Sequence, residues 1–353
     1  MISSYAGIAP RGDLVLLRRL GERLRGRSFL HINSTKSGGG VAEILHRALP
    51  LIRSLGLDAR WDTIQGDPLF FETTKKIHNA LQGSRENITP QMWRHYEEVN
   101  DANARRLDLA ADAVLVHDPQ PAALIAHAPG GTWLWRCHID VANPQPEVWE
   151  RLAGYCRRYA GAIFSADSFV RPMDIEEFVV NPSIDPLSEK NRELTAKEIS
   201  ETLERLGVPA DRPMVLQVSR FDRFKDPLGV IRAYRIVRKY NDCILVLAGS
   251  PADDDPEGAA VLSEVQEFAA GDPDVHVLLL PAGSDLEINA LQRQATVVLQ
   301  KSLKEGFGLT VAEAMWKGKP VVGGATGGIP TQILQGGTGF LVYSEEGAAF
   351  RIR

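Results

Sequence analysis

Short apolar runs alternate with helix-patterned segments along most of this chain of 353 residues, and this alternation restricts its fold more than any other feature. In the first half, the apolar runs that predict strands are Ser28–Asn33, Ala113–His117, Thr132–Cys137 and Ala162–Ser165. The segments that predict helices are Ala42–Leu55, Thr89–Arg106 and Pro146–Tyr159. Apolar strands that are separated by helices predict a parallel sheet covered on both faces.

The alternation is interrupted once, at Val180–Lys190, where two prolines and the lack of periodicity predict a linker. After it, predicted strands are Met214–Val218, Ile244–Ala248, Val275–Leu280, Thr296–Leu299 and Pro320–Gly323, with helices at Pro227–Tyr240 and Asp285–Gln294. A chain of this length is too long for one ordinary core. We therefore predict an α/β protein of two Rossmann-like, doubly wound domains, residues 1–182 and 183–353, that face a cleft. Ligands of such sheets bind beyond the carboxyl ends of the strands.

Composition excludes several classes of protein. The net charge is -5, without the basic surplus of a nucleic-acid-binding surface. No apolar run approaches the roughly 20 residues of a membrane span, and the N-terminus lacks a secretory pattern. The three cysteines have no metal-binding spacing and predict reduced thiols in a cytoplasmic protein. The acidic run Asp253–Asp255 predicts a solvated loop or a helix start, so no metal site is expected.

Three glycines, Gly38, Gly39 and Gly40, follow the first predicted strand and precede the first predicted helix. Glycine permits positive φ and close approach of the backbone to a ligand, and a helix N-terminus attracts anions. The run matches neither the dinucleotide-binding fingerprint nor the P-loop. A plain strand-to-helix turn explains it as well, so ligand contact is one of two interpretations.

Arg220 and Lys225 follow the first strand of the second domain, where a helix is about to begin. Arginine offers a planar fork to phosphate oxygens and lysine a point charge. Together they predict a diphosphate site. A solvated charged loop is the alternative.

Glu305 and Glu313 are separated by seven residues that include the turn Gly306-Phe307-Gly308 and the start of a helix at Leu309. The glycines allow close approach to a ligand, and the helix N-terminus favours phosphate. The first acid suits hydroxyls of a sugar, and the second suits a diol such as ribose. The alternative is a loop acid and an exposed helix acid without a ligand.

Arg136, His138 and Asp140 lie two residues apart at the end of a predicted strand, so on an extended segment they share one face. Such a face suits a hydroxyl-rich ligand. His117-Asp118-Pro119, after the preceding strand, either lines the same cleft or forms a turn.

Taken together, these motifs resemble the retaining nucleotide-sugar glycosyltransferases of family 4, which have the GT-B fold. More narrowly, HINSTKSGGGVAEIL, LVHDPQP, WRCHID and QVSRFDRFKDP resemble trehalose glycosyltransferring synthases and their relatives, the retaining trehalose phosphorylases. The resemblance implies transfer of glucose from an NDP-glucose (UDP- or ADP-glucose) to glucose, forming trehalose. Trehalose phosphorolysis, or nucleotide-sugar binding without turnover, is the alternative.

The resemblance also implies roles for residues of the second domain. Glu305 accepts hydrogen bonds from hydroxyls of the donor glucose, and the backbone of Gly306, Phe307, Gly308 and Leu309 contacts sugar and phosphate. Glu313 holds the ribose, and Arg220 and Lys225 neutralise the diphosphate.

In the first domain, the implied roles concern both substrates. The Gly38–Gly40 loop approaches the phosphate, and His138 touches the donor sugar near the reacting carbon. Arg136 and Asp140 lie on the acceptor side. The expected mechanism is front-face substitution, in which the leaving phosphate oxygen takes the acceptor's proton, and domain closure excludes water.

No cofactor is required in this interpretation: the NDP-glucose is a co-substrate, and a divalent metal is not implied. The expected partners are the nucleotide sugar and glucose or trehalose, with no nucleic acid or membrane, and a homodimer is expected only by analogy. Family members usually continue past a motif like GGTGFLVYSEEGAA with further helices. A longer C-terminus is therefore expected to raise the melting temperature.

Overall fold

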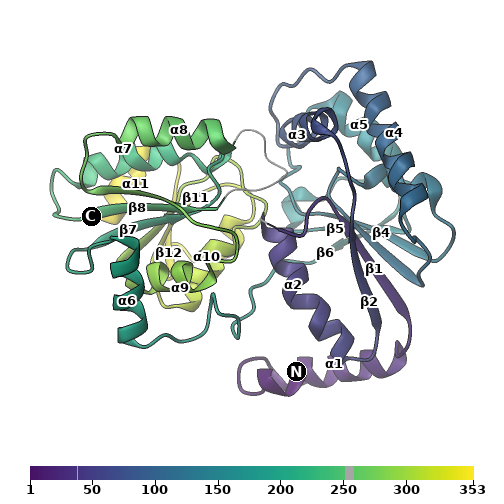
Figure 1. The fold of residues 1–353 in the computed structure, drawn as a ribbon, viewed down its shortest axis with the longest axis horizontal. Coiled ribbons are helices and arrows are strands. Elements are labelled where there is room, and N and C mark those ends of the chain that lie inside the picture. Colours follow the sequence, from purple (N-terminus) through teal and green to yellow (C-terminus); the bar gives the residue numbers. More distant parts are fainter. Residues whose placement is uncertain (38, 251–257) are drawn as a thin grey trace. The chain divides into compact units, whose positions relative to one another are not determined.

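The computed structural model describes residues 1–37, 39–250 and 258–353 of the chain (Figure 1). It contains two compact units, Met1–Asn181 and Pro182–Arg353. Their division lies one residue before the boundary predicted from the linker. Each unit is a parallel α/β sheet with helices on both faces, as the alternation of apolar runs and helical segments predicts.

The helices and strands of the Met1–Asn181 unit alternate for the most part, except that α4 follows α3 directly and that, within the described residues, no α-helix separates β3 from β4 or β5 from β6. They are α1 (Arg11–Arg23), β1 (Ser28–Asn33), α2 (Gly39–Ser54), β2 (Asp58–Thr63), α3 (Pro68–Leu81), α4 (Pro90–Arg106), β3 (Ala113–His117), β4 (Thr132–Cys137), α5 (Pro146–Cys156), β5 (Gly161–Phe164) and β6 (Glu176–Val179). The 3₁₀ helices are η1 (Ile2–Tyr5), η2 (Ala122–His127) and η3 (Asp167–Phe169).

The strands of this unit form one parallel sheet in the order β2-β1-β3-β4-β5-β6. From β1 the chain goes outward to β2 on one side and then returns to β3 on the other. The sheet therefore has a topological switch point between β1 and β3, and in doubly wound sheets this is where ligands bind. Figure 1 shows α3, α4 and α5 together on one face of the sheet, with α1 and α2 on the other.

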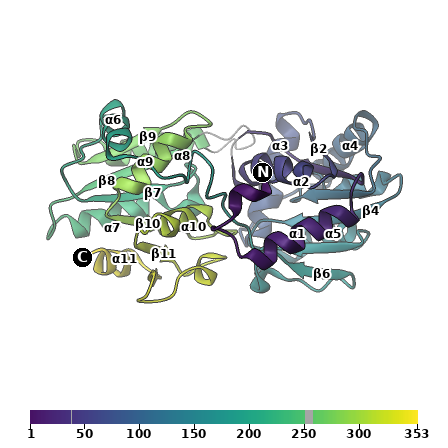
Figure 2. The same cartoon turned by 90° about the horizontal axis from the view of Figure 1, so that it is seen from below.

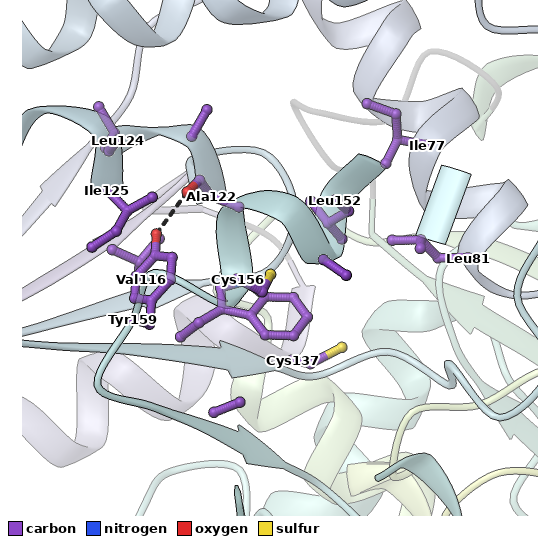
Figure 3. Packing of buried hydrophobic residues seen from close by; sticks show 14 of the residues in the cluster. Ile77, Leu81, Val116, Ala122, Leu124, Ile125, Cys137, Leu152, Cys156 and Tyr159 are labelled. Carbon is purple, nitrogen blue, oxygen red and sulfur yellow. Dashed lines mark hydrogen bonds between the residues drawn. The ribbon is translucent and has the colours of Figure 1, made fainter. Parts of the chain in front are cut away.

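The core of the Met1–Asn181 unit lies between the sheet and the α3–α5 layer (Figure 3). Alternate residues of β4, Trp133, Trp135 and Cys137, point into it, as a pleated strand requires. Tyr159 is buried there, and its hydroxyl donates to the carbonyl oxygen of Ala122 at 2.8 Å. A smaller apolar cluster joins α2 to β2 on the opposite face.

The Pro182–Arg353 unit repeats the alternation. Its elements are α6 (Ala196–Leu206), β7 (Met214–Val218), η4 (Arg223–Lys225), α7 (Pro227–Val237), β8 (Ile244–Gly249), α8 (Gly258–Ala269), β9 (Val275–Leu279), α9 (Asp285–Gln294), β10 (Val297–Gln300), α10 (Leu309–Trp316), β11 (Val321–Gly324), η5 (Ile329–Thr331), β12 (Gly339–Val342) and α11 (Glu345–Ile352). The strand order is β12-β11-β10-β7-β8-β9, all parallel. The switch point lies between β7 and β10.

Both faces of this second sheet are buried, which explains why its central strands are mostly apolar; Gln217 in β7 and Gln300 in β10 are the polar exceptions. Val215 of β7 packs with α7, α8 and α11, whereas Met214 and Leu216 pack with α6, α9 and α10. Figure 2 shows these helices from a second direction. The carboxyl ends of β7 and β10 are therefore held rigidly side by side, and the loops that follow them are positioned by a fully packed sheet.

Each predicted strand is present, with ends that differ by at most one residue. Three strands were not predicted: β2, β6 and β12. All three lie at sheet edges. An edge strand is partly exposed and needs no continuous apolar run; every residue of β6 is exposed. The sequences of β2 (DARWDT) and β6 (EEFV) therefore lack the apolar run on which the prediction depended, whereas β12 (GFLV) is apolar but only four residues long.

Candidate functional site

Lys225 and Glu305 meet at the switch point of the Pro182–Arg353 unit. Lys225 ends η4, in the loop after β7, and Glu305 lies in the loop after the neighbouring strand β10. The Lys225 Nζ atom is 2.7 Å from both carboxylate oxygens of Glu305. The side chains are 18% and 9% exposed, so this ion pair is largely shielded from water. The sequence prediction had placed these residues at one edge without predicting their direct contact.

Further hydrogen bonds join the two loops. The backbone N–H of Leu303 donates to the Phe224 carbonyl oxygen at 2.7 Å, and within the loop after β10 the Ser302 hydroxyl donates to Glu305 Oε2 at 3.1 Å. Asp226 forms an ion pair with Lys301 and accepts from the Gly229 N–H at 3.1 Å, which caps α7. Acids and bases thus alternate along this edge.

The turn before α10 has the conformation that its glycines predict. Gly308 has a φ of 87° and is the N-cap of α10, and the Thr310 hydroxyl donates to the Val218 carbonyl oxygen at 3.1 Å. This bond places the first turn of α10 against the carboxyl end of β7. Opposite the turn, a Cβ on Gly327 would lie 1.7 Å from the Glu305 carbonyl oxygen, so only glycine allows the two loops to approach this closely.

Arg220 follows β7 directly and is partly exposed, with 30% of its side chain accessible. Its Nη2 atom lies 3.9 Å from Asp222 Oδ2, and Asp222 in turn accepts from the Phe224 N–H at 2.7 Å. Arg220, Lys225 and the first turn of α10 therefore occur at the same edge of the sheet. Positive side chains and helix N-terminal amides favour a phosphate group at such an edge.

Glu313 is completely buried, which neither interpretation of the sequence foresaw. Lys190 Nζ lies 2.8 Å from Glu313 Oε1, and Gln292 Nε2 donates to Oε2 at 2.9 Å. Lys317 completes the network by donating to Gln292 Oε1 at 2.7 Å. Burial alone would raise the pKa of Glu313, but the Lys190 charge, hydrogen bonds from Lys190 and Gln292, and the Lys317 charge hold that pKa below its usual value.

The expectation of an exposed helix acid at position 313 is therefore wrong, because Glu313 is the buried anchor of a network of side chains. Lys190 lies in the segment predicted as the linker, so the network ties that segment to α9 and α10. Ribose binding by Glu313 stays a prediction, and it would require the Lys190–Glu313 contact to open.

In the Met1–Asn181 unit, three histidines meet at the switch point of the sheet. His31 Nδ1 lies 3.0 Å from His117 Nε2, and His117 Nδ1 lies 2.9 Å from His138 Nε2. They come from β1, from β3 and from the residue after β4. Asp118, in a left-handed conformation with φ 63°, accepts from the His138 N–H at 2.8 Å and so fixes the start of this loop.

Arg136 and Asp140 are not placed as predicted. The strand β4 ends at Cys137, so the extended face expected from Arg136 to Asp140 does not exist. Arg136 donates to the Val180 carbonyl oxygen at 3.2 Å. Asp140 is buried and accepts from the Ala142 N–H at 3.0 Å, as in a turn. Their acceptor-side roles stay predictions.

Two regions singled out in the sequence cannot be placed. Gly38 and the acidic run Asp253–Asp255 lie outside the described residues, whereas Gly39 and Gly40 begin α2. Within residues 1–37, 39–250 and 258–353, no three His, Cys, Asp or Glu side chains are arranged so that they could hold a metal ion together. In the same ranges no helix has the length and apolar character that crossing a bilayer requires.

The sequence did not predict several polar residues of these sites: the buried Ser302, Gln292 and His31, and the partly buried Lys190 and Lys317. Lys190, Gln292 and His31 are far in sequence from their partners, whereas Ser302 lies in a loop only three residues from Glu305 and belongs to no recognisable motif. Among these residues, only His31 could have been identified from the sequence, because it is a polar residue within an otherwise apolar predicted strand.

Two family models match the chain in succession. Residues 31–171 match the N-terminal domain of trehalose synthase, and residues 198–352 match the glycosyl transferases group 1. A trehalose synthase from Pyrococcus horikoshii is 47% identical over 358 residues, which cover 99% of this chain and 86% of the relative. A trehalose synthase from Rubrobacter xylanophilus is 43% identical, and the match covers 95% of this chain and 83% of that relative.

Solved structures agree on the fold. An α,α-trehalose-phosphate synthase (UDP-forming) from Burkholderia xenovorans, in complex with glucose-6-phosphate, superposes with a TM-score of 0.75 at 14% identity, covering 93% of this chain and 92% of that chain. At this identity the likeness concerns the GT-B fold alone. The 47% and 43% identities to the two synthases extend over nearly the whole chain. With the shared fold, they show that the chain belongs to the trehalose synthase family of GT-B glycosyltransferases.

Proposed function

We propose that this chain transfers glucose from an NDP-glucose, UDP- or ADP-glucose, to glucose with retained configuration, forming trehalose. The observation that carries the proposal is the Lys225–Glu305 pair at the switch point of the Pro182–Arg353 unit, beside the N-terminus of α10. Binding such a donor requires a group that accepts hydrogen bonds from the sugar hydroxyls and, close to it, positive groups for the diphosphate. Glu305 suits the first requirement, and Lys225 and the N-terminus of α10 suit the second.

Each group at this edge has a distinct role in the proposal. Glu305, whose carboxylate can only accept hydrogen bonds while it is ionised, binds hydroxyls of the donor glucose. Lys225, Arg220 and the first amides of α10 bind the diphosphate and stabilise its charge as it leaves. These fixed positive groups take the part that a divalent metal plays in other phosphate sites.

The burial of Glu313 argues against a double displacement, in which a second carboxylate would attack the sugar. Its oxygens are bound by Lys190 and Gln292, with no exposed surface. In front-face substitution the bond from the anomeric carbon to the phosphate oxygen breaks, and a bond to the acceptor oxygen forms on the same side. The acceptor's hydroxyl proton passes to the leaving phosphate oxygen, so no protein nucleophile is needed.

Trehalose phosphorolysis is a second candidate, favoured by one comparison. A trehalose phosphorylase from Grifola frondosa is 28% identical over 99% of this chain, although the chain covers only 54% of that relative. The positive groups that would bind a diphosphate also suit inorganic phosphate or glucose-1-phosphate.

A donor screen tests the proposal. The chain is incubated with glucose and UDP-glucose, ADP-glucose or glucose-1-phosphate in turn, and with maltose alone, and trehalose is quantified. We expect trehalose from at least one nucleotide sugar. Product from glucose-1-phosphate alone would favour the phosphorylase, and product from maltose alone would contradict glucosyl transfer from a nucleotide donor.

Glu305→Gln provides the matched site variant, because the amide keeps the side-chain size and removes the charge. We expect its kcat/KM to fall by roughly 10²-fold or more, as for loss of one transition-state contact. Glu264→Gln is the control, since Glu264 pairs with Arg223 of the same loop but on the exposed surface. Wild-type activity in Glu305→Gln would refute the assigned site.

A further inference from the structure

The three histidines of the Met1–Asn181 unit form one continuous hydrogen-bonded chain. The His31 and His117 rings are stacked with centroids 5.3 Å apart and planes inclined by 18°, and His117 and His138 repeat this at 5.2 Å and 20°. Each contact joins an Nδ1 atom to the Nε2 atom of the next ring. The direction of the chain is therefore the same at both contacts.

All three rings are neutral near pH 7. Burial, followed by the positive charge of Arg136, lowers the pKa of His31 to about 4. Burial is also the main cause that lowers the pKa of His117 and of His138 well below the usual value; neighbouring histidines and Arg136 add to it. A neutral imidazole has one N–H and one lone pair. Two contacts can then form only if all three rings carry the proton on the same type of nitrogen.

The His31 end of the chain decides which nitrogen this is. Among the described residues, His31 Nε2 is buried and has no hydrogen-bond partner. If all protons were on Nε2, His31 would bury an unsatisfied N–H, and buried orphan N–H donors are rarer than under-satisfied acceptors. If all three protons are on Nδ1, His31 Nε2 buries only an unsatisfied lone pair. His31 then donates to His117, and His117 donates to His138.

We propose that His31 and His117 are positioning residues that hold His138 as the Nδ1–H tautomer, which offers an N–H donor to a sugar hydroxyl. The sugar as ligand rests on the proposed function, whereas the tautomer rests on the two contacts, on the neutrality of the rings and on the buried His31 Nε2 atom without a partner among the described residues. The His117–His138 contact also restricts the orientation of the His138 ring, because Nε2 of His138 must face Nδ1 of His117 and the two rings are stacked.

The tautomers are measured directly by long-range ¹H–¹⁵N correlation spectra of the full chain with ¹⁵N-labelled histidine at pH 7. Single-histidine variants assign the signals, and His276, in the other unit, provides an internal reference. We expect His31, His117 and His138 each to carry the proton on Nδ1. An Nε2–H form or a charged imidazole at any of the three would overturn the proposal.

Two variants of His31 test whether the chain positions His138. His31→Phe removes the donor to His117, whereas His31→Asn keeps an N–H near the position of Nδ1. We expect His31→Phe to shift His138 towards the Nε2–H form and to lower kcat/KM roughly 10- to 100-fold through misplacement of its ring, with His31→Asn restoring both.

The outcomes separate the two claims. An equal loss of kcat/KM in His31→Phe and His31→Asn would overturn the positioning role. An unchanged His138 tautomer in His31→Phe would overturn it as well. His276→Phe is the control for loss of a histidine ring elsewhere, and we expect it to retain activity. If the wild-type chain makes no trehalose from any nucleotide sugar, the proposed function fails, and the spectra still decide the tautomer.

Discussion

At the scale of single residues, the buried carboxylate of Glu313 has the clearest energetic consequence. Its charge is compensated by Lys190 and by the Gln292 amide. Replacing Glu313 by Gln leaves the Lys190 charge without its partner in a poorly hydrated place, and breaking a buried pair in this way costs about 3–5 kcal/mol. We expect chemical denaturation at pH 7 to show a loss of this size.

The pH dependence of this loss has a definite sign. The pKa of Glu313 is lower in the folded chain than in the unfolded one. Its contribution to stability is therefore complete above the unfolded pKa and is lost as the pH falls through the folded pKa. The difference in unfolding free energy between wild type and Glu313→Gln should shrink below about pH 4.3, the ordinary glutamate value. A difference that grows on acidification would contradict the ion pair.

The double variant Glu313→Gln, Lys190→Met provides the control. Removing both charges avoids an uncompensated buried ion, so it should recover part of the stability lost in the single variant. If the effects of the two substitutions on the free energy of unfolding are simply additive, Lys190 and Glu313 do not interact as the structure indicates.

Residue patterns predicted part of this site. Glu305 and Lys225 each follow a strand, and parallel strands end at one edge, so their proximity was predictable from sequence. The contacts of Glu313 were not, because Lys190, Gln292 and Lys317 come from three segments that carry no common motif. Tertiary packing brings these side chains together, and the hydrophobic periodicity of the sequence does not predict which buried polar side chains will be in contact.

At the scale of elements, the turn before α10 depends on a glycine in a different loop. Gly327→Ala would place a Cβ 1.7 Å from the Glu305 carbonyl oxygen, where φ is also positive at 58°. One of the two loops must then move. We expect a loss of activity comparable to that of Glu305→Gln, together with a lower melting temperature.

Gly318→Ala is the matched substitution. Gly318 also has a positive φ, 70°, but a Cβ there meets nothing within 4 Å. Only the left-handed backbone is penalised, by about 1–2 kcal/mol, so we expect stability to fall and activity to remain. Equal losses of activity in the two variants would show that the approach of the Gly327 and Glu305 loops does not matter for turnover.

The elements themselves were predictable to different degrees. Central strands such as β7 and β8 are buried on both faces and appear as apolar runs. The edge strands β2 and β6 do not, and they were missed for that reason; β12 was missed although its four residues are apolar. The histidine chain shows the same limit: strand order cannot be read from sequence, so the meeting of His31 and His117 became evident only in the sheet.

At the scale of the whole molecule, the apolar cores are separate. The main clusters of buried residues lie either within Met1–Asn181 or within Pro182–Arg353. We therefore expect residues 182–353, expressed alone, to unfold cooperatively and to bind UDP or ADP, because Arg220, Lys225 and α10 all belong to this unit. Calorimetry with the Lys225→Met variant as control measures this. Binding that is equally strong in the variant would contradict the assigned diphosphate site.

Transfer of label from donor to product tests the central claim most directly. The full chain is incubated with unlabelled glucose and UDP- or ADP-glucose carrying ¹³C throughout the glucosyl ring, and the sugars are followed by NMR. We expect α,α-trehalose with one labelled ring and one unlabelled ring per molecule, the labelled anomeric carbon keeping its α configuration. Labelled glucose released without any labelled trehalose from either donor would contradict the central claim.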